Sequence, residues 1–166
     1  MKNLPKKFVF TLWVFGLMGQ VAWVAENMYF NVFIYKMFHA SAAAISTMVA
    51  ASAVTATVTT LIAGTWSDRV GRRKPFICGG YILWGLSILA FCFLRTDILG
   101  RGGKDLAAVL SMGVNLTIFL DCLMTVFGST ANDACFNAWL TESGDATNRG
   151  AIEGVNAMMP LAALSV

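Results

Sequence analysis

Long apolar segments separated by short polar links dominate the hydrophobic pattern of this chain. Each complete segment is long enough to cross the hydrocarbon core of a bilayer, about 30 Å thick, at the helical rise of about 1.5 Å per residue. The pattern therefore predicts an all-α integral membrane protein with four transmembrane helices and the start of a fifth. The predicted helices cover residues 8–35, 42–66, 76–94, 106–140 and 151–166.

Some segments have features of their own. The first is longer than one crossing needs, which predicts tilt or projection beyond the membrane. The second is rich in small residues, which either allow a neighbouring helix to approach closely or fill a lipid-facing surface. The polar link Arg95–Asp105 contains three glycines and charges of both signs, so it predicts an exposed turn.

The composition agrees with a lipid environment. Of the 166 residues 57% are hydrophobic and 13% are charged, whereas a soluble domain carries roughly 25% charged residues. A net charge of +3, with the basic residues confined to links, gives no indication of nucleic-acid binding. The four cysteines lie in or beside apolar segments without a CxxC pair, and no Walker loop, nucleophile elbow or metal-ligand cluster occurs. The sequence therefore predicts no enzyme, no cofactor and no metal site.

The basic residues of the links predict the orientation of the bundle. Eight lie on the side of the amino terminus and four on the opposite side. The eight are Lys2, Lys6, Lys7, Arg69, Arg72, Arg73, Lys74 and Arg149, and the four are Lys36, Arg95, Arg101 and Lys104. Because cytoplasmic loops carry the excess of lysine and arginine, we expect a multi-pass protein of the cell membrane with a cytoplasmic amino terminus.

The link between the second and third predicted helices carries the most specific signal. Residues 64–76 read GTWSDRVGRRKPF. Gly71 can adopt the positive φ of a tight reversal, and Pro75 suits the first turn of the next helix. Asp68 can accept hydrogen bonds from a helix amino terminus or pair with an arginine. A simple positive-inside anchor would explain the charge, but it would not explain the ordered glycines and aspartate.

This stretch resembles the loop motif of the major facilitator superfamily, G-x-x-x-D-R-x-G-R-[RK]. Its form SDRxGRRxPF is similar in particular to that of the glycoside–pentoside–hexuronide:cation symporters. The spacing of the spans fits as well, so the resemblance covers essentially the whole chain. It implies an amino-terminal bundle of the superfamily fold, in which this loop fastens the two halves together and is released during transport. The gating residues that it implies are Gly64, Asp68, Arg69, Gly71, Arg72 and Arg73.

Polar residues inside the first predicted span need a role, because a charged side chain at mid-bilayer costs about 3 kcal/mol. At about 100° per residue they follow one stripe that includes Gly16, with a carboxylate at its edge. An aromatic ring with amides and a carboxylate suits sugar hydroxyls, and the alternative is hydrogen bonding between helices. The residues that we expect to bind substrate here are Gln20, Trp23, Glu26, Asn27 and Asn31.

The fourth predicted span carries two acids, Asp121 and Asp133. Since no lysine or arginine lies within any predicted span, these acids are protonated, bind a cation, reach water or pair with a group elsewhere. The first two possibilities suit an ion-coupled symporter, so we expect both acids to act in cation coupling. We expect Asn132 and Asn137 to contact substrate. If the helix ends near Ser129, however, Asp133 is a solvated terminal residue.

The stretch from Asn132 to Trp139 resembles the corresponding helix of these symporters, which implies that Asp133 is a cation ligand or proton carrier. Two departures leave the coupling ion open between H⁺ and Na⁺. Asp121 stands where many members of the superfamily carry an arginine, and the second span lacks the aspartates of sugar:cation symporters. Glu142 and Arg149 form either a second cytoplasmic latch or an ordinary solvated loop pair.

Together these features predict a secondary transporter for cation-coupled symport of a sugar or glycoside by alternating access. The alternatives are an exporter of drug-like compounds from the same superfamily and a non-transporting membrane assembly or regulatory protein. Because members of the superfamily have about twelve spans, we expect the chain to be an amino-terminal fragment that is inactive alone, and the alternative is that several copies assemble. Its expected partners are the lipid bilayer, a small-molecule substrate and the missing carboxy-terminal half.

Overall fold

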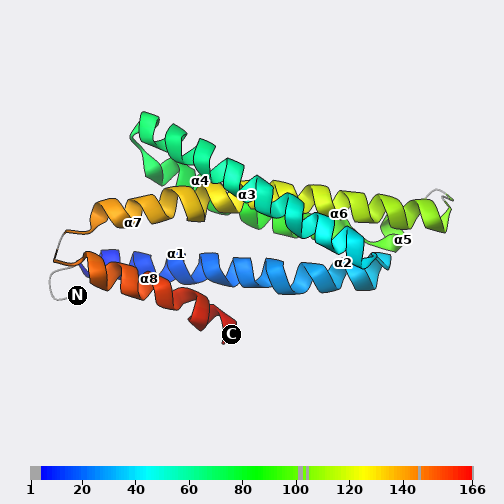
Figure 1. The fold of residues 1–166 in the computed structure, drawn as a ribbon, viewed down its shortest axis with the longest axis horizontal. Coiled ribbons are helices and arrows are strands. Elements are labelled where there is room, and N and C mark those ends of the chain that lie inside the picture. The colour runs from blue at the N-terminus through cyan, green and yellow to red at the C-terminus, as the bar shows by residue number, and fades with distance from the viewer. Residues whose placement is uncertain (1–4, 101–102, 104, 146, 166) are drawn as a thin grey trace.

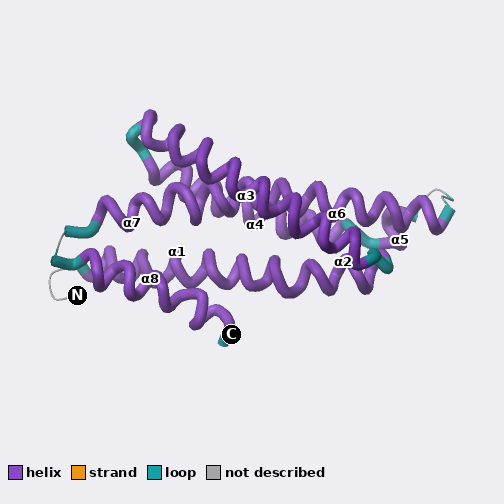
Figure 2. Tube along the Cα trace, in the orientation of Figure 1, coloured by secondary structure: helices purple, strands orange, loops and turns teal. Residues whose placement is uncertain are grey.

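The protein is an elongated bundle of helices that lie roughly side by side (Figure 1). The computed structural model describes residues 5–100, 103, 105–145 and 147–165. Among these residues, four helices are long and apolar enough to cross a membrane, and short loops join them (Figure 2). They cover Lys6–Phe38, Ala42–Val70, Arg73–Phe93 and Leu106–Ser143.

The first membrane helix consists of three consecutive parts. Helix α1 covers Lys6–Ala25, a π-helical segment covers Glu26–Phe30, and α2 covers Asn31–Phe38. The helix ends at His39, which adopts a left-handed conformation with φ of 50°. It therefore extends three residues beyond Tyr35, the end expected from the sequence.

Helices α3 and α4 form the hairpin that carries the loop motif. Helix α3 covers Ala42–Val70 and begins after Ser41, whose hydroxyl accepts a hydrogen bond from the Ala44 amide at 3.2 Å. It ends at Gly71, which has a φ of 65°. Helix α4 covers Arg73–Ala90, with Pro75 in its first turn, and a 3-10 turn follows over Phe91–Phe93. The predicted positive φ of the glycine and the predicted place of the proline are both confirmed.

The link after this hairpin differs from the expected exposed turn. It contains a short helix, α5, over Thr96–Leu99, which the Gly100 amide closes by donating to the Thr96 carbonyl at 2.9 Å. The prediction of a plain turn was wrong because the residues before the glycines are sufficient for one helical turn. Arg101 and Lys104 of this link, like Lys2 at the amino terminus, lie outside the described residues.

The last part of the chain forms one long helix and one shorter helix. Helix α6 covers Leu106–Gly128, a second π-helical segment covers Ser129–Phe136, and α7 continues it over Asn137–Ser143. Asp133 thus lies inside a continuous helix, so the alternative of a helix that ends near Ser129 was wrong. Helix α8 covers Arg149–Leu164 and lies beside α1 (Figure 1).

Two apolar clusters hold the bundle together. One joins α1, α4, α7 and α8 through buried side chains that include Leu12, Ile77 and Ile152. The other joins α2, α3, α4 and α6 through Ile34, Phe38, Met48, Trp84 and Met124. Many large apolar side chains elsewhere are exposed, which suits helices whose outer surface contacts lipid.

The turns of the bundle alternate between its two ends (Figure 1). The start of α1, the α3–α4 loop and the end of α7 lie toward one end, whereas the α2–α3 loop and α5 lie at the other. This up-and-down arrangement places the Arg73 region and the start of α8 on the same side of the molecule. The polar residues of the membrane helices lie between these ends.

Candidate functional site

Glu26 is the buried carboxylate of the first membrane helix. It begins the π-helical segment Glu26–Phe30 and is only 7% exposed. Its Oε1 lies 3.2 Å from the Thr125 hydroxyl on α6, whereas its Oε2 is buried without a hydrogen-bond partner. Because buried polar atoms in folded proteins nearly always have partners, the orphaned oxygen needs an explanation, and an unfilled ligand position is one.

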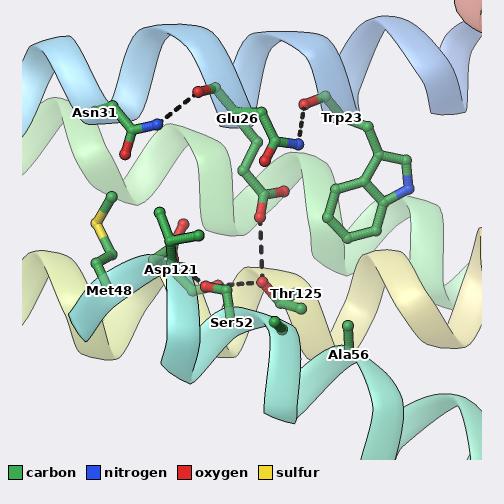
Figure 3. A pocket seen from close by; sticks show the side chains of 11 residues that line it. Trp23, Glu26, Asn31, Met48, Ser52, Ala56, Asp121 and Thr125 are labelled. Atoms are coloured by element: carbon green, nitrogen blue, oxygen red, sulfur yellow. Dashed lines mark hydrogen bonds between the residues drawn. The ribbon is translucent and has the colours of Figure 1, made fainter. Parts of the chain in front are cut away.

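Asp121 lines the same cavity as Glu26, a space of about 210 Å³ between the first, second and fourth membrane helices (Figure 3). It is 3% exposed and accepts a hydrogen bond from the Ser52 hydroxyl on α3. Thr125, one turn further along α6, donates to the Asp121 backbone carbonyl at 2.8 Å. We name the group of Glu26, Ser52, Asp121 and Thr125 the acid pair cluster.

The rest of the cavity wall is mostly apolar. The residues that line it besides the cluster are Trp23, Asn27, Asn31, Met48, Val49, Ala53 and Ala56. None of these lining residues, and no member of the cluster, is a lysine, an arginine or a histidine. The cavity therefore combines two acids, two hydroxyls, two amides and an indole without a basic residue in its wall. Such a mixture of apolar surface and a few converging polar groups is typical of a small-molecule site.

Two amides of the first helix, Asn27 and Asn31, donate hydrogen bonds within that helix. The Asn27 side chain donates to the Trp23 carbonyl at 2.8 Å, and the Asn31 side chain donates to the Asn27 carbonyl at 2.7 Å. These bonds leave the side-chain oxygens available, and Asn31 Oδ1 is buried without a partner. Gln20, which sequence periodicity places on the same stripe, is not among the residues that line the cavity.

Asp133 belongs to a second polar group. The Asn132 side chain donates to Asp133 Oδ1 at 3.1 Å, and the Tyr81 hydroxyl lies 3.0 Å from Asn132 Oδ1. Asp133 is twelve residues beyond Asp121 on one continuous helix, which separates the two acids by about 18 Å along the helix axis. The structure therefore does not bring the two expected coupling residues together.

Asn137, the remaining expected substrate contact, also lies away from the cavity. Its side chain donates to the Asp133 carbonyl at 3.3 Å and accepts a hydrogen bond from Asn156 of α8 at 3.2 Å. Asn137 is exposed, and its bond to α8 provides a polar link between α7 and α8. Here the amide joins two helices, which is the alternative role considered for such residues.

The loop motif forms an ion-paired group at one end of the bundle. Arg73 Nη2 contacts Asp68 Oδ1 at 2.7 Å, and Arg73 Nη1 donates to the Ser67 hydroxyl at 3.0 Å. The predicted pairing of Asp68 with an arginine is confirmed. Arg69 and Arg72 of the motif are exposed, and the space around Gly64 is open. Arg73 is therefore the arginine that organises this loop.

Glu142 pairs with Arg73 and not with Arg149. Arg73 Nε donates to Glu142 Oε2 at 2.7 Å, and Nη2 also contacts Oε1. Of the two alternatives for Glu142 and Arg149, the latch between them is not what the structure shows, because Glu142 pairs with Arg73 and Arg149 is exposed at the start of α8. The Arg73–Glu142 pair connects the α3–α4 loop to the end of α7, at the same end of the bundle. The arginine of this connection is Arg73 and not Arg149.

Two serines of these sites were not identified from the sequence. Ser52 bonds to Asp121, and Ser67 bonds to Arg73. Both lie in a helix rich in alanine, serine and threonine, where many hydroxyls instead bond to the carbonyl of the preceding turn. The spacing of Ser67, one residue before Asp68, was an available signal, whereas Ser52 has no comparable neighbour in the sequence.

A comparison with known protein families identifies the family to which these membrane helices, the acidic cavity and the ion-paired loop belong. The family model described as Major Facilitator Superfamily matches residues 9–163. The chain belongs to the Major Facilitator Superfamily. No curated protein and no solved structure gave a match to it.

Membership of the superfamily confirms the expected fold class and the broad function. The protein is a multi-pass membrane transporter whose environment is the lipid bilayer and whose substrate is a small molecule. Superfamily transporters are generally not enzymes. Within the described part of the chain, no group of three or more histidine, cysteine, aspartate or glutamate residues is placed to hold a metal ion.

Proposed function

We propose that this chain forms one wall of a secondary transporter that couples the movement of a sugar or glycoside to a cation by alternating access. The observation that carries the proposal is the cavity of about 210 Å³ between the membrane helices, with its indole, amide, hydroxyl and carboxylate groups. A sugar presents hydroxyls that these acceptors can bind and an apolar ring face that can lie on Trp23.

Asn27 and Asn31 are the first candidates for hydroxyl recognition. Each uses its amide nitrogen within its own helix, so its side-chain oxygen remains an acceptor for the ligand. Asn31 Oδ1 is already buried without a partner, and a ligand hydroxyl there would satisfy it. Gln20, Asn132 and Asn137 lie outside the cavity wall and are omitted from the proposed substrate contacts.

The coupling cation, H⁺ or Na⁺, requires an acid that changes its charge during transport. Asp133 and Asp121 are the proposed coupling residues, since both are carboxylates inside a membrane helix. Asp133 lies beside Asn132 in the second polar group and also bonds to Trp23, a residue of the cavity wall. A cation at Asp133 would therefore lie next to the space proposed for the sugar.

The opposing wall of the cavity is supplied by a second set of helices. In transporters of this kind the substrate lies near the bilayer midplane between two structural repeats, which rock around it. The end of the bundle that carries Arg73 faces the cytoplasm, because the basic residues of the described loops concentrate there. The ion-paired loop accordingly acts at the cytoplasmic gate.

The test is uptake of a panel of labelled sugars into proteoliposomes that contain the transporter with this chain. The expected result is accumulation driven by an inward proton or sodium gradient, with loss of accumulation in Asp133→Asn. Asp97→Asn is the matched control, because Asp97 is an exposed acid that pairs with Arg95 outside the membrane helices.

The outcomes separate the alternatives. Uptake that needs no gradient, or an unaffected Asp133→Asn, removes Asp133 from coupling. Absence of uptake for every sugar, together with drug resistance of cells that express the transporter, favours the exporter. Absence of both activities, with retention of a partner protein that tolerates acid substitutions, favours the non-transporting assembly or regulatory protein.

A further inference from the structure

The hydroxyl hydrogens of the cavity wall are already used by the protein. The Ser52 hydroxyl donates to the Asp121 carboxylate. The Thr125 hydroxyl has two acceptors, the Asp121 backbone carbonyl at 2.8 Å and Glu26 Oε1 at 3.2 Å. A hydroxyl has a single hydrogen, so neither residue has one left for a ligand, whichever acceptor Thr125 takes.

The nitrogen donors of the wall are largely used as well. The Trp23 indole bonds to the Asp133 carboxylate. Asn27 and Asn31 each donate one of the two amide hydrogens to a carbonyl of their own helix, at 2.8 and 2.7 Å. One hydrogen on each amide is what the wall can still offer to a ligand.

The acceptors of the wall, by contrast, include buried atoms without partners. Glu26 is 7% exposed, and its Oε2 has no hydrogen-bond partner. Asn31 Oδ1 is buried and unpaired in the same way. Figure 3 shows the Glu26 carboxyl group pointing from the first membrane helix toward Thr125. The cavity thus requires a ligand that donates hydrogen bonds, because unpaired buried acceptors are costly.

Charge adds a second requirement. The cavity wall contains the carboxyl groups of Glu26 and Asp121, and none of its lining residues is basic. A neutral sugar can donate hydrogen bonds, but it cannot compensate buried negative charge. A protonated amine supplies N–H donors and a positive charge together, and the Trp23 ring in the wall suits a cation on its face.

We propose that the cavity binds a protonated amine through Glu26, and that the transported sugar is therefore an amino sugar. The amine site stands on the donors, acceptors and charges of the wall, whereas the transport of an amino sugar rests on the proposed function. The ammonium group bonds to Glu26 Oε2, and a ring hydroxyl bonds to Asn31 Oδ1. Asp121 keeps its bond to Ser52 and stays available for coupling.

The first experiment measures binding without transport. The unmodified chain in lipid nanodiscs at neutral pH is titrated calorimetrically with amino sugars, among them glucosamine and galactosamine. Each is compared with its parent sugar and with its N-acetyl derivative, which keeps the nitrogen but loses the charge. At least one amino sugar should bind about tenfold or more tightly than both neutral counterparts, as a hydrogen bond between charged groups requires. Equal or weaker binding of every amino sugar overturns the proposal.

A pair of simpler ligands tests the ammonium group by itself. Cyclohexylamine should compete with the bound amino sugar, whereas cyclohexanol, which has the same ring without the charge, should not. Competition by both compounds to the same extent would assign the binding to the apolar ring and contradict the proposal.

Variants then assign the preference to Glu26. Glu26→Gln should bind amino sugar and parent sugar equally, because the amide keeps the shape but loses the charge. Glu26→Asp should retain the preference with weaker binding, and Asp97→Asn, an exposed acid of α5, should match the unmodified protein. A preference that survives in Glu26→Gln removes Glu26 from the site. If Glu26→Gln does not fold, the ligand pairs on the unmodified protein and Glu26→Asp still decide.

Transport is measured separately in proteoliposomes that contain the transporter with this chain. An amino sugar should accumulate under a proton or sodium gradient with a KM about tenfold or more below that of its parent sugar. Equal KM values for the two overturn the amino-sugar assignment. If neither sugar accumulates although the amine binds, the proposed function fails and the amine site stands.

Discussion

Arg73 and Glu142, which are 69 residues apart in the sequence, form a two-point ion pair with Nε–Oε2 at 2.7 Å and Nη2–Oε1 at 2.5 Å. The same guanidinium contacts Asp68 on α3, so it connects three membrane helices at one end of the bundle. The arginine side chain is only 14% exposed, although both of its acidic partners are largely exposed. The planar guanidinium group can bond to both carboxylate oxygens of Glu142 and to Asp68 at once, whereas the ammonium group of a lysine cannot.

Arg73→Lys should weaken this connection. The lysine ammonium keeps the charge but cannot span both oxygens of Glu142 and also reach Asp68. Because the acids are exposed, we expect a loss of about 1 kcal/mol in the free energy of unfolding, measured by thermal unfolding in detergent. Arg72→Lys is the control, since Arg72 is an exposed arginine of the same motif. Equal effects at both positions would mean that the ion pair does not stabilise the bundle.

Gly113 of α6 lies directly against the ring of Phe38 at the end of α2. A Cβ atom there would overlap the ring of Phe38, so Gly113→Ala forces the ring or a helix to move. We expect a destabilisation of about 1–3 kcal/mol, partly relieved when Phe38→Leu is added. Thermal unfolding of both single variants and of the double variant checks this coupling.

The matched control for this prediction is Gly85→Ala. Gly85 is also a helical glycine, but no atom lies within 4 Å of the place where its Cβ would be. The alanine should leave stability unchanged or raise it, because alanine favours helix more than glycine does. Simple additivity of Gly113→Ala and Phe38→Leu would show that the ring is not the obstacle.

The two glycines of the loop motif should respond differently to alanine. Gly71 has a φ of 65°, a conformation that costs a residue with a Cβ about 1 kcal/mol. Gly64 lies within α3, and the space around it is open. Gly71→Ala should therefore lower the melting temperature and Gly64→Ala should not. A stronger effect at Gly64 would indicate that this glycine contacts helices beyond those described.

The orientation of the bundle can be read by cysteine labelling. In a protein whose native cysteines are replaced by alanine, Asp97→Cys in α5 should react with a membrane-impermeant maleimide added to intact cells. Asp145→Cys in the α7–α8 loop should react only after the cells are permeabilised. This is the result expected if the amino terminus is cytoplasmic, and the opposite labelling pattern would reverse the proposed orientation.

Local backbone rules explain what could be predicted from the sequence. Gly71 and Pro75 act within a few residues of their own positions, so the hairpin between α3 and α4 followed from the sequence. The hydrophobic lengths likewise indicated the membrane helices. The pairing of Arg73 with Glu142 depends instead on how α4 and α7 pack, and Arg149 satisfied the sequence criteria for a partner equally well.

The cavity was only partly predictable for a similar reason. Periodicity at about 100° per residue placed Glu26 at the edge of its stripe, yet the structure buries it at the centre of a polar cluster. That periodicity assumes a regular α-helix, whereas Glu26 begins a π-helical segment. Ser52 and Asp121 meet across 69 residues through the packing of α3 on α6, which no local pattern encodes.

The π-helical segments Glu26–Phe30 and Ser129–Phe136 also constrain insertions and deletions. A π turn encloses one more residue than an α turn, so it absorbs an extra residue without changing the rotational phase of the helix beyond it. Deleting one residue within Glu26–Phe30 would therefore restore an α-helix and leave α2 facing the same neighbours, whereas a deletion within α1 would rotate α2 by about 100° about its axis. After a deletion in α1, Ile34 and Phe38 would turn away from the apolar cluster although neither side chain had changed. The π-helical segment is therefore the part of the first membrane helix that tolerates the loss of one residue.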